Sequence, residues 1–453
     1  MIRWCLVLLL SGCAAFRSYD AELYTTLERA SVGSVDEAIR LLDGNNRSAD
    51  KDVLYYLELG MLQRLAGRYE ESQKAWTLAN ARLQAAPQGL PGEGFVRGLS
   101  SYVISDKLRA YPGYDYEKVM LLTYMALNHL ALGDYDNARV AIRQAHDLEA
   151  QIAEQRAQQY AEVEESARER GAKGSFKDLN GYPIETLDTP EVNALRNGYQ
   201  SALSHYLAGF IYEALGEPSL AAPGYRLANE LQPGSPLLEE ALRGLDQRVA
   251  APDDGMTDVL FVIGSGSAPA LQSRQFMLPV TVGDKFILIA NAFPVMTATS
   301  HSALPGSVSL EGLTLPLAPI ASVDLMARRR LMDDMPAIML RATIRSTVST
   351  TLQYQAQRAS DREHTLAIAL AAGVITLGSA MLASADDRTW RALPSEVSVA
   401  RGRLPRGMAR VTLHAPEGER SAEVSLSGRH AVVDLRLLRQ HVFMNAPAAG
   451  AAR

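Results

Sequence analysis

Hydrophobic positions in the first half of the chain recur every three or four residues, and this spacing predicts helices from residue 19 to about 250. Three stretches share one further pattern: YLELGMLQRLAGRYEESQKAWTLA, YMALNHLALGDYDNARVAIRQA and HYLAGFIYEALGEPSLAAPGYRLANELQP. In each, a small residue is followed by a glycine seven positions later and by a large residue nine positions after that glycine. The pattern predicts two helices that cross closely at the small residue and are separated by a turn at the glycine.

The repeat positions are Gly60, Gly67, Tyr69 and Trp76 in the first stretch, Ala126, Gly133 and Tyr135 in the second, and Gly209, Gly216 and Tyr225 in the third. They resemble the tetratricopeptide repeat, a helix-turn-helix unit of ~34 residues. A degenerate fourth unit is predicted near Gly33. The third unit departs from the pattern at Pro218 and Pro223, and the units are not contiguous. We therefore expect a compact, irregular bundle rather than a regular superhelix.

This resemblance implies a concave surface that holds a peptide or a segment of another protein, as stacked helical hairpins commonly do. The alternative is a helical spacer without a ligand. After the second unit, a highly charged stretch predicts a long exposed helix that ends at Gly171 and Gly174. A loop with turn signals at Asn180 and Tyr182 then leads to the third unit.

The pattern changes after residues 252–255, whose sequence PDDG predicts a linker. Short β-rich runs follow, with turn residues between them. We predict an α+β protein with an all-α repeat domain over 13–250 and a β-rich domain with inserted helices over 251–453. From Leu393 to Leu438 the strands are expected to form a small antiparallel sandwich.

Two helical segments interrupt the β-rich half. One is predicted from Pro336 to Arg362, and the other is the apolar stretch 365–383, which carries no charge. Its length is close to the ~20 residues that a membrane-spanning helix needs. Because it is rich in alanine and glycine and contains Thr376 and Ser379, we expect it to be buried or packed against another helix. Membrane insertion remains the alternative.

The amino-terminal residues 1–12 have the layout of a secretory signal, with Arg3 before a short apolar run. The sequence LSGC that ends at Cys13 resembles the lipobox of bacterial lipoproteins. In that family the cysteine receives acyl chains such as palmitate, and the chain is cleaved before it. Ala14, where an aspartate would retain the protein at the inner membrane, implies the outer membrane, facing the periplasm. A plain signal peptide is the alternative.

Charge and chemistry exclude several function classes. The net charge is -6 and the basic residues are dispersed, so a nucleic-acid partner is not expected. The cluster RRR at 328–330 has acidic neighbours, including Asp333 and Asp334, and is predicted to be a solvated helix face. The other acidic pair, Glu164 and Glu165, is also expected to be exposed.

Motifs for catalysis or for cofactors are incomplete. Gly264 and Gly266 begin a dinucleotide fingerprint, but Pro269 stands where its third glycine belongs. The eight histidines show no metal-binding spacing, and His129 and His205 are expected to pack within the repeats. We therefore predict no catalytic residue, no cofactor and no metal.

Short motifs in the second half point to one more resemblance. DRTW at 387–390 and LP at 393–394, with RA at 341–342, are similar to an uncharacterised group of proteobacterial lipoproteins with tetratricopeptide-like repeats. Within this motif we expect Trp390 to be buried and Arg388 to pair with an acidic neighbour. The expected function is a lipid-anchored scaffold or adaptor that binds periplasmic or outer-membrane proteins. The alternatives are an accessory of an export or pore complex, with 365–383 in a membrane, and a cell-wall hydrolase.

Overall fold

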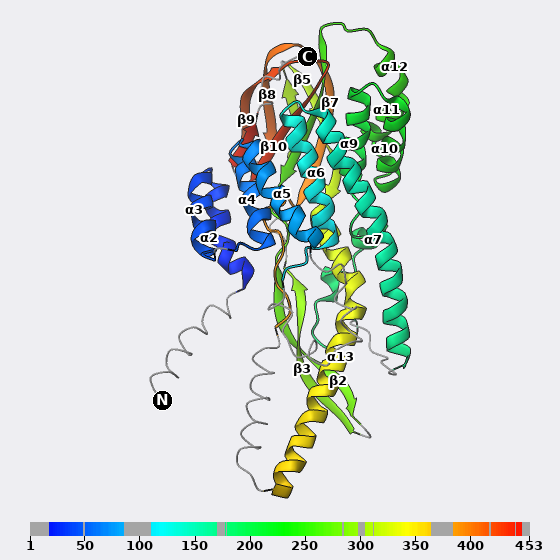
Figure 1. The fold of residues 1–453 in the computed structure, drawn as a ribbon. Helices are drawn as coiled ribbons and strands as arrows, with labels where there is room; N and C mark the ends of the chain where they lie inside the picture. Colours follow the sequence, from blue (N-terminus) through cyan, green and yellow to red (C-terminus); the bar gives the residue numbers. More distant parts are fainter. Residues whose placement is uncertain are drawn as a thin grey trace.

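The computed structural model describes residues 18–48, 50–85, 110–169, 177, 179–282, 285–297, 304–310, 312–363, 384–415, 418–439 and 441–445 (Figure 1). Helices form the first part of the chain and strands dominate the second, which confirms the α+β class. The signal segment 1–12, Cys13 and the apolar stretch 365–383 lie outside the described residues. Within those residues, no helix is both long and apolar enough to cross a membrane.

Four helical hairpins build the first part, as far as the structure describes it. They are α2 (Tyr19–Ser31) with α3 (Val35–Asn45), α4 (Val53–Leu65) with α5 (Tyr69–Ala85), α6 (Asp115–Ala131) with α7 (Tyr135–Glu169), and α9 (Ala202–Ala214) with α10 (Pro218–Leu231). Shorter elements connect or follow them: η5 (Ile184–Thr186), α8 (Pro190–Ala194), α11 (Pro236–Arg243) and α12 (Leu245–Ala250). The degenerate unit predicted near Gly33 is the first of these hairpins, so the helical part is tetratricopeptide-like but irregular.

The same turn closes all four hairpins. Gly33, Gly67, Gly133 and Gly216 have φ angles of 86°, 71°, 75° and 75°, a conformation that glycine adopts without strain. In each turn the amide after the glycine donates to a carbonyl five residues earlier, for example Arg68 N to Gln63 O at 2.9 Å. This is the pairing of a glycine-terminated helix. The glycine spacing in the sequence thus marks the ends of the inner helices.

The described residues of the second part form three sheets. The five-stranded sheet has the order β11-β10-β1-β7-β6, the four-stranded sheet the order β5-β4-β8-β9, and β2 pairs with β3 alone. The strands are β1 (Met256–Ser265), β2 (Leu271–Val282), β3 (Lys285–Met296), β4 (Ser307–Leu310), β5 (Leu313–Pro316), β6 (Ala318–Ser322), β7 (Glu396–Pro405), β8 (Gly407–Ala415), β9 (Gly418–Leu426), β10 (His430–Leu438) and β11 (His441–Asn445).

The five-stranded sheet is the middle of three layers. Alternate residues of β1 point to opposite faces. Leu260 and Val262 join the core formed with the helices, whereas Val259, Phe261 and Ile263 join a second core against the four-stranded sheet. Both faces are therefore covered, which explains the nearly continuous apolar run of β1.

The strand pairing corrects the expected antiparallel sandwich over Leu393–Leu438. A sandwich exists, but β1, β4 and β5, which precede that range, belong to it, and β10 pairs with β1 in parallel. The predicted linker also makes defined contacts: Asp253 pairs with Arg406 at 2.7 Å, and Asp254 pairs with Arg403 at 2.9 Å.

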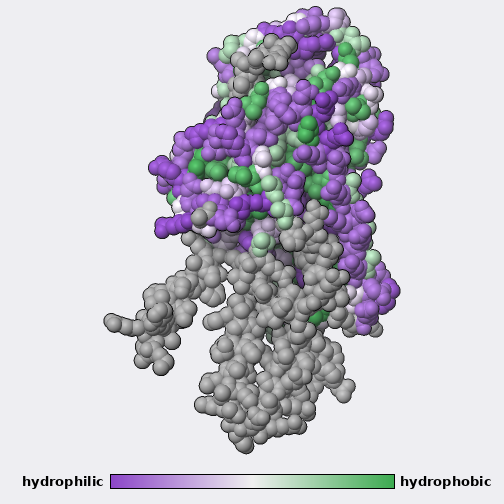
Figure 2. Space-filling view, in the orientation of Figure 1, coloured by the Kyte–Doolittle hydropathy of each residue, from purple (hydrophilic) through white to green (hydrophobic). Residues whose placement is uncertain are grey.

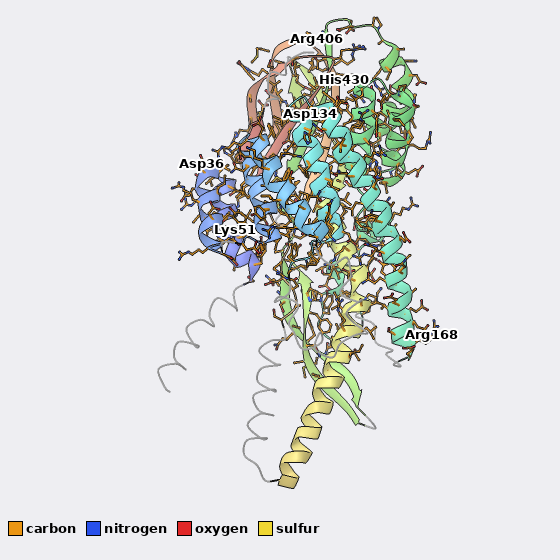
Figure 3. All side chains as sticks on the ribbon, viewed as in Figure 1. Asp36, Lys51, Asp134, Arg168, Arg406 and His430 are labelled. Carbon is orange, nitrogen blue, oxygen red and sulfur yellow. The ribbon has the colours of Figure 1, made fainter. Side chains whose placement is uncertain are left out.

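The hairpin β2–β3 and the helix α13 (Val323–Glu363) extend away from the three layers (Figure 1). The helix begins before Pro336, where the sequence predicted its start, and Pro336 lies inside it. The loop between α7 and α9 packs onto this extension, because the Tyr182 hydroxyl donates to Pro294 O at 3.0 Å. Helix α7 also passes beyond the three layers, and Arg168 lies near the end of α7 that is farthest from them (Figure 3).

Candidate functional site

The inner face of the helical hairpins is filled by the protein's own β-rich part. Almost every residue of the inner helices α6 and α9 is buried, which leaves no side of these helices open. Trp390 packs edge-on against Trp76 at 5.8 Å between ring centroids, and Phe210 packs against His430 at 5.7 Å. The concave surface implied by the resemblance is therefore covered, in the described helices, by the protein's own β-rich part and does not stand free for a segment of another protein.

The repeat positions make the close helix crossings. A Cβ atom on Gly60 would lie 2.2 Å from Nε1 of the fully buried Trp76, and one on Gly209 would lie 2.5 Å from the ring of Tyr225. The backbones can approach this closely only without a side chain. The smallest side chain, Ala126, is fully buried at the corresponding place in the second hairpin.

Two turn tyrosines fill the space beside these crossings. Tyr69 is buried beneath the Arg64 guanidinium, which lies 5.3 Å from its ring centroid. The Tyr135 hydroxyl donates to His430 O in β10 at 3.0 Å. The repeat residues thus also connect the helices to the sheet.

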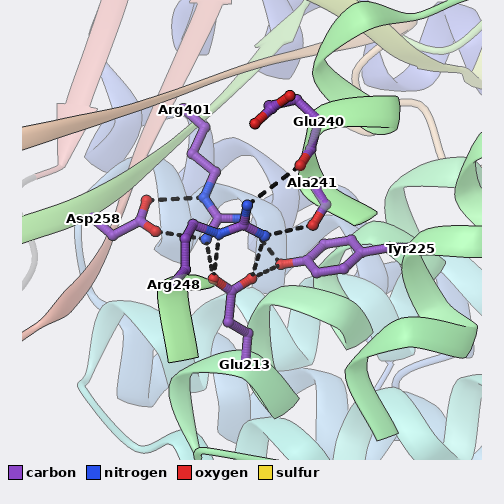
Figure 4. A network of polar contacts seen from close by, with 7 residues as sticks. All are labelled: Glu213, Tyr225, Glu240, Ala241, Arg248, Asp258 and Arg401. Carbon is purple, nitrogen blue, oxygen red and sulfur yellow. Dashed lines mark hydrogen bonds and ion pairs between the residues drawn. The ribbon is translucent and has the colours of Figure 1, made fainter. Parts of the chain in front are cut away.

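A buried network of charged groups connects α9 and α12 to the five-stranded sheet (Figure 4). From β7, Arg401 donates to both carboxylate oxygens of Asp258 at 2.9 and 2.6 Å and to Glu213 at 2.7 Å. Its Nη1 also donates to the Tyr225 hydroxyl at 3.0 Å. Arg248 donates to the same Glu213 carboxylate at 2.6 and 3.1 Å. We call these five residues the junction network.

The junction network contains two arginines and two carboxylates, so its positive and negative charges balance. Burial disfavours the ionised form of Glu213, but hydrogen bonds from Arg248 and the charge of Arg401 outweigh it and lower the pKa of Glu213 to about 2. Glu213, Asp258 and His430 lie close enough together to hold a metal ion. However, Arg401 already supplies the positive charge between the two carboxylates. The network is therefore a structural ion cluster.

A second connection consists of two glutamates that bind a single segment of backbone. Glu117 in α6 accepts from Trp390 N at 2.7 Å, while Glu58 in α4 accepts from Arg391 N at 2.7 Å and from Ala392 N at 2.9 Å. All the groups involved are buried except part of Arg391. We call this arrangement the glutamate clamp, because it fixes the segment before β7 between the helices.

Burial strongly affects both clamp carboxyls. It raises the pKa of Glu58 to about 8, against the lowering effect of the backbone donors and Arg391. Burial likewise raises the pKa of Glu117, although Trp390 N and the Tyr111 hydroxyl donate to it. The clamp therefore contains two carboxyls whose ionisation the protein interior resists.

The motif around Trp390 has the predicted structural roles. Trp390 is fully buried, and Arg388 pairs with Asp386 at 2.8 Å. The histidines are also packed as expected: His205 is buried with Nε2 2.9 Å from Glu149, and His129 lies 3.4 Å from Asp134.

The arginine cluster of α13 is not the solvated face that its sequence predicted. Arg328 is buried and pairs with Asp324 at 2.8 Å, and the Arg330 guanidinium lies 3.6 Å from the ring centroid of Tyr114. Asp334 is also buried and pairs with Arg330 at 2.6 Å. The tertiary contacts of α13 with the helical part bury these charges in pairs.

The two expected acidic pairs therefore differ. The side chains of Glu164 and Glu165 are 74% and 61% exposed, as predicted. Asp334 was also expected to be exposed, but it is buried, and Arg156 from α7 pairs with it as well. No local pattern indicates this partner, which lies far away along the chain.

Comparisons with known proteins add little to this description. No family model and no curated protein matches the sequence. A solved tetratricopeptide repeat protein from Parabacteroides merdae ATCC 43184 is similar at 14% identity, over 50% of this chain and 97% of that chain, with a TM-score of 0.14. A TM-score this low carries no argument about fold or function.

Proposed function

We propose that the protein is a non-catalytic, lipid-anchored scaffold at the periplasmic side of the outer membrane, and that it binds other envelope proteins. In this proposal the array of helical hairpins binds these proteins, since modules of this kind commonly bind protein segments. The observation that carries the proposal is the arrangement of the outer helices α5, α7 and α10. Each packs one face on the inner helices and leaves the other face exposed.

The binding surface in this proposal is the outer side of the hairpins, because the inner side is filled. Each outer helix exposes at least one large apolar side chain: Leu78 in α5, Val140 and Tyr160 in α7, and Leu220 in α10 are 44–52% exposed. Hydrophobic residues are scattered among polar ones on the face seen in Figure 2. Such a surface suits a partner that binds through several small contacts rather than through one deep pocket.

Site-specific photo-crosslinking should locate the partner. A photoreactive phenylalanine analogue at Leu78, Val140, Tyr160 or Leu220 is expected to give adducts with envelope proteins in intact cells, because these side chains face outward. The adducts are detected by mass spectrometry. The matched control is Met408 in β8, which is 65% exposed but lies on the opposite side of the sandwich from the helices. The same adducts from Met408, or none from the helix positions, would remove the proposed binding surface.

The anchor has a separate test. Replacing Cys13 by serine should leave an unprocessed precursor that incorporates no labelled palmitate, because the acylated sulfur is missing. Cys5→Ser is the control, since Cys5 lies within the signal segment, and it should be processed and labelled normally. Normal processing of the Cys13→Ser protein would contradict the lipoprotein assignment.

A further inference from the structure

A small cavity lies where α4 and α6 meet β1 and β10, away from the junction network. Its lining includes Arg64, Tyr124, Asp434 and Arg436. The space inside admits a particle of about the size of one water molecule. A ligand of this cavity is therefore restricted to a water molecule or a small ion.

The charges around the cavity are unequal. Arg64, Asp434 and Arg436 are only 2%, 8% and 5% exposed. Arg64 pairs with Asp434 at 2.9 Å and also donates to the Asn128 side chain. The charge of Asp434 also acts on Arg436, so two buried guanidiniums share the one carboxylate among the lining residues, and the lining carries a net positive charge.

Arg436 also has unused donors. Its Nη2 donates to Ala392 O at 3.2 Å, but Nε and Nη1 are buried and have no hydrogen-bond partner in the part of the chain that the structure describes. Burial lowers the pKa of Arg436 to about 10, so the guanidinium is still charged at neutral pH. A buried charge with unpaired N–H groups is costly unless something compensates it.

We infer that this cavity binds one small monoatomic anion, chloride under physiological conditions, next to Arg436. An anion supplies the missing negative charge and accepts from at least one of the unpaired N–H groups. The cavity is too small for phosphate or a carboxylic acid. The bound ion would strengthen the attachment of β10 to the helices, because Arg64 comes from α4 and Arg436 from β10.

Thermal unfolding of the mature protein in different sodium salts at constant ionic strength tests this inference. Chloride or bromide at about ten times its Kd should raise the Tm by about 2 °C over gluconate, which cannot enter the cavity. The Arg436→Met protein should lose this difference. Arg410→Met, at a position where the side chain is 68% exposed, should keep it. Equal Tm values for the wild-type protein in all three salts would overturn the inference.

A crystal grown or soaked in bromide provides a second test that does not depend on any variant folding. An anomalous bromide peak beside Arg436 in the cavity is expected. A water molecule in the cavity together with bromide peaks only at the protein surface would overturn the inference. Neither result bears on whether the outer helices bind envelope proteins.

Discussion

Replacing Arg401 by methionine should lower the free energy of unfolding by about 3–5 kcal/mol, the usual loss when one partner of a buried ion pair is removed. Arg401 bridges Asp258 and Glu213 across the boundary between the sheet and the helices. Without it, Asp258 loses both of its strong donors, and Glu213 keeps only Arg248 among the arginines. Methionine has a similar length, so the loss comes mainly from the uncompensated carboxylates rather than from a cavity.

The matched control for this prediction is Arg403→Met on the same strand. Arg403 pairs with Asp254, and both side chains are about half exposed, so its loss should cost less than about 1 kcal/mol. Urea unfolding followed by circular dichroism measures both variants. If Arg401→Met costs no more than Arg403→Met, the junction network does not hold the two parts together.

A double variant separates the loss of the ion pair from the cost of the buried carboxylates that are left without a partner. Adding Asp258→Asn to Arg401→Met removes one of the carboxylates left without a partner, so it should restore part of the stability. A double variant that is less stable than Arg401→Met would contradict this account of the energy. The comparison requires reversible, two-state unfolding of each protein.

Much of the fold could be predicted from local patterns. The apolar spacing near 3.6 residues gave the helical half, and the turn glycines Gly67, Gly133 and Gly216 located the hairpin turns because only the local backbone decides them. The strands of the second half also followed from short β-rich runs between turn residues. These features depend on residues a few positions apart, which a single sequence displays directly.

The filled groove and the parallel β1–β10 pair could not be predicted in this way. They depend on which segments meet across the whole chain: Asp258 pairs in register with His430, and Glu58 binds the backbone of Arg391. A repeat pattern shows that an inner face exists, but it does not show what covers that face. A single sequence carries no pairwise signal that links such distant positions.

The buried charges illustrate the same limit in more detail. Arg401 stands in the strand sequence VARGRL beside other arginines, and nothing local distinguishes it from Arg403 at the surface. Glu58 could be recognised more easily from the sequence, since it is the one charged residue in the apolar run YLELG of a buried helix. A charged residue at an inward position of a helix needs a partner, although its identity comes only from the fold.

The free energy of unfolding of Glu58→Gln should gain about 2 kcal/mol or more on that of the wild type between pH 5 and pH 8. Glutamine has the shape of the protonated carboxyl and does not titrate. Its NH2 group faces one of the two backbone N–H donors at every pH, and this constant loss cancels when pH 5 is compared with pH 8. The pKa of Glu58 rises to about 8 in the folded protein, mainly through burial. The ordinary value near 4.5 applies when the chain is unfolded.

The direction of this change in stability with pH follows from proton binding to Glu58. Between pH 4.5 and 8 the folded wild type holds the Glu58 proton more tightly than the unfolded chain does, so its stability decreases as the pH rises through this range. The slope is at most about 1.4 kcal/mol per pH unit for one proton. The variant lacks this proton, and its stability therefore does not decrease for this reason.

Other groups titrate in the same range but affect both proteins alike. Burial lowers the pKa of His146 and of His430, and burial raises the pKa of Glu396 to about 7. Their contributions cancel when the stability of the variant is compared with that of the wild type at each pH. Urea unfolding at pH 5, 6.5 and 8 gives this difference directly.

The opposite result would have a defined cause in the hydrogen bonds to Glu58. Two backbone N–H groups and Arg391 favour the ionised form of Glu58, and burial beside Glu117 opposes it. If the hydrogen bonds outweigh burial, the pKa of Glu58 does not rise on folding, and Glu58→Gln gains no stability on the wild type between pH 5 and pH 8. Glu164→Gln on the exposed end of α7 is the control, and it should change stability by less than about 0.5 kcal/mol at every pH. A stability difference that does not rise from pH 5 to pH 8 would mean that the glutamate clamp binds the segment at Trp390 as a carboxylate, and burial would no longer be the dominant effect at this site.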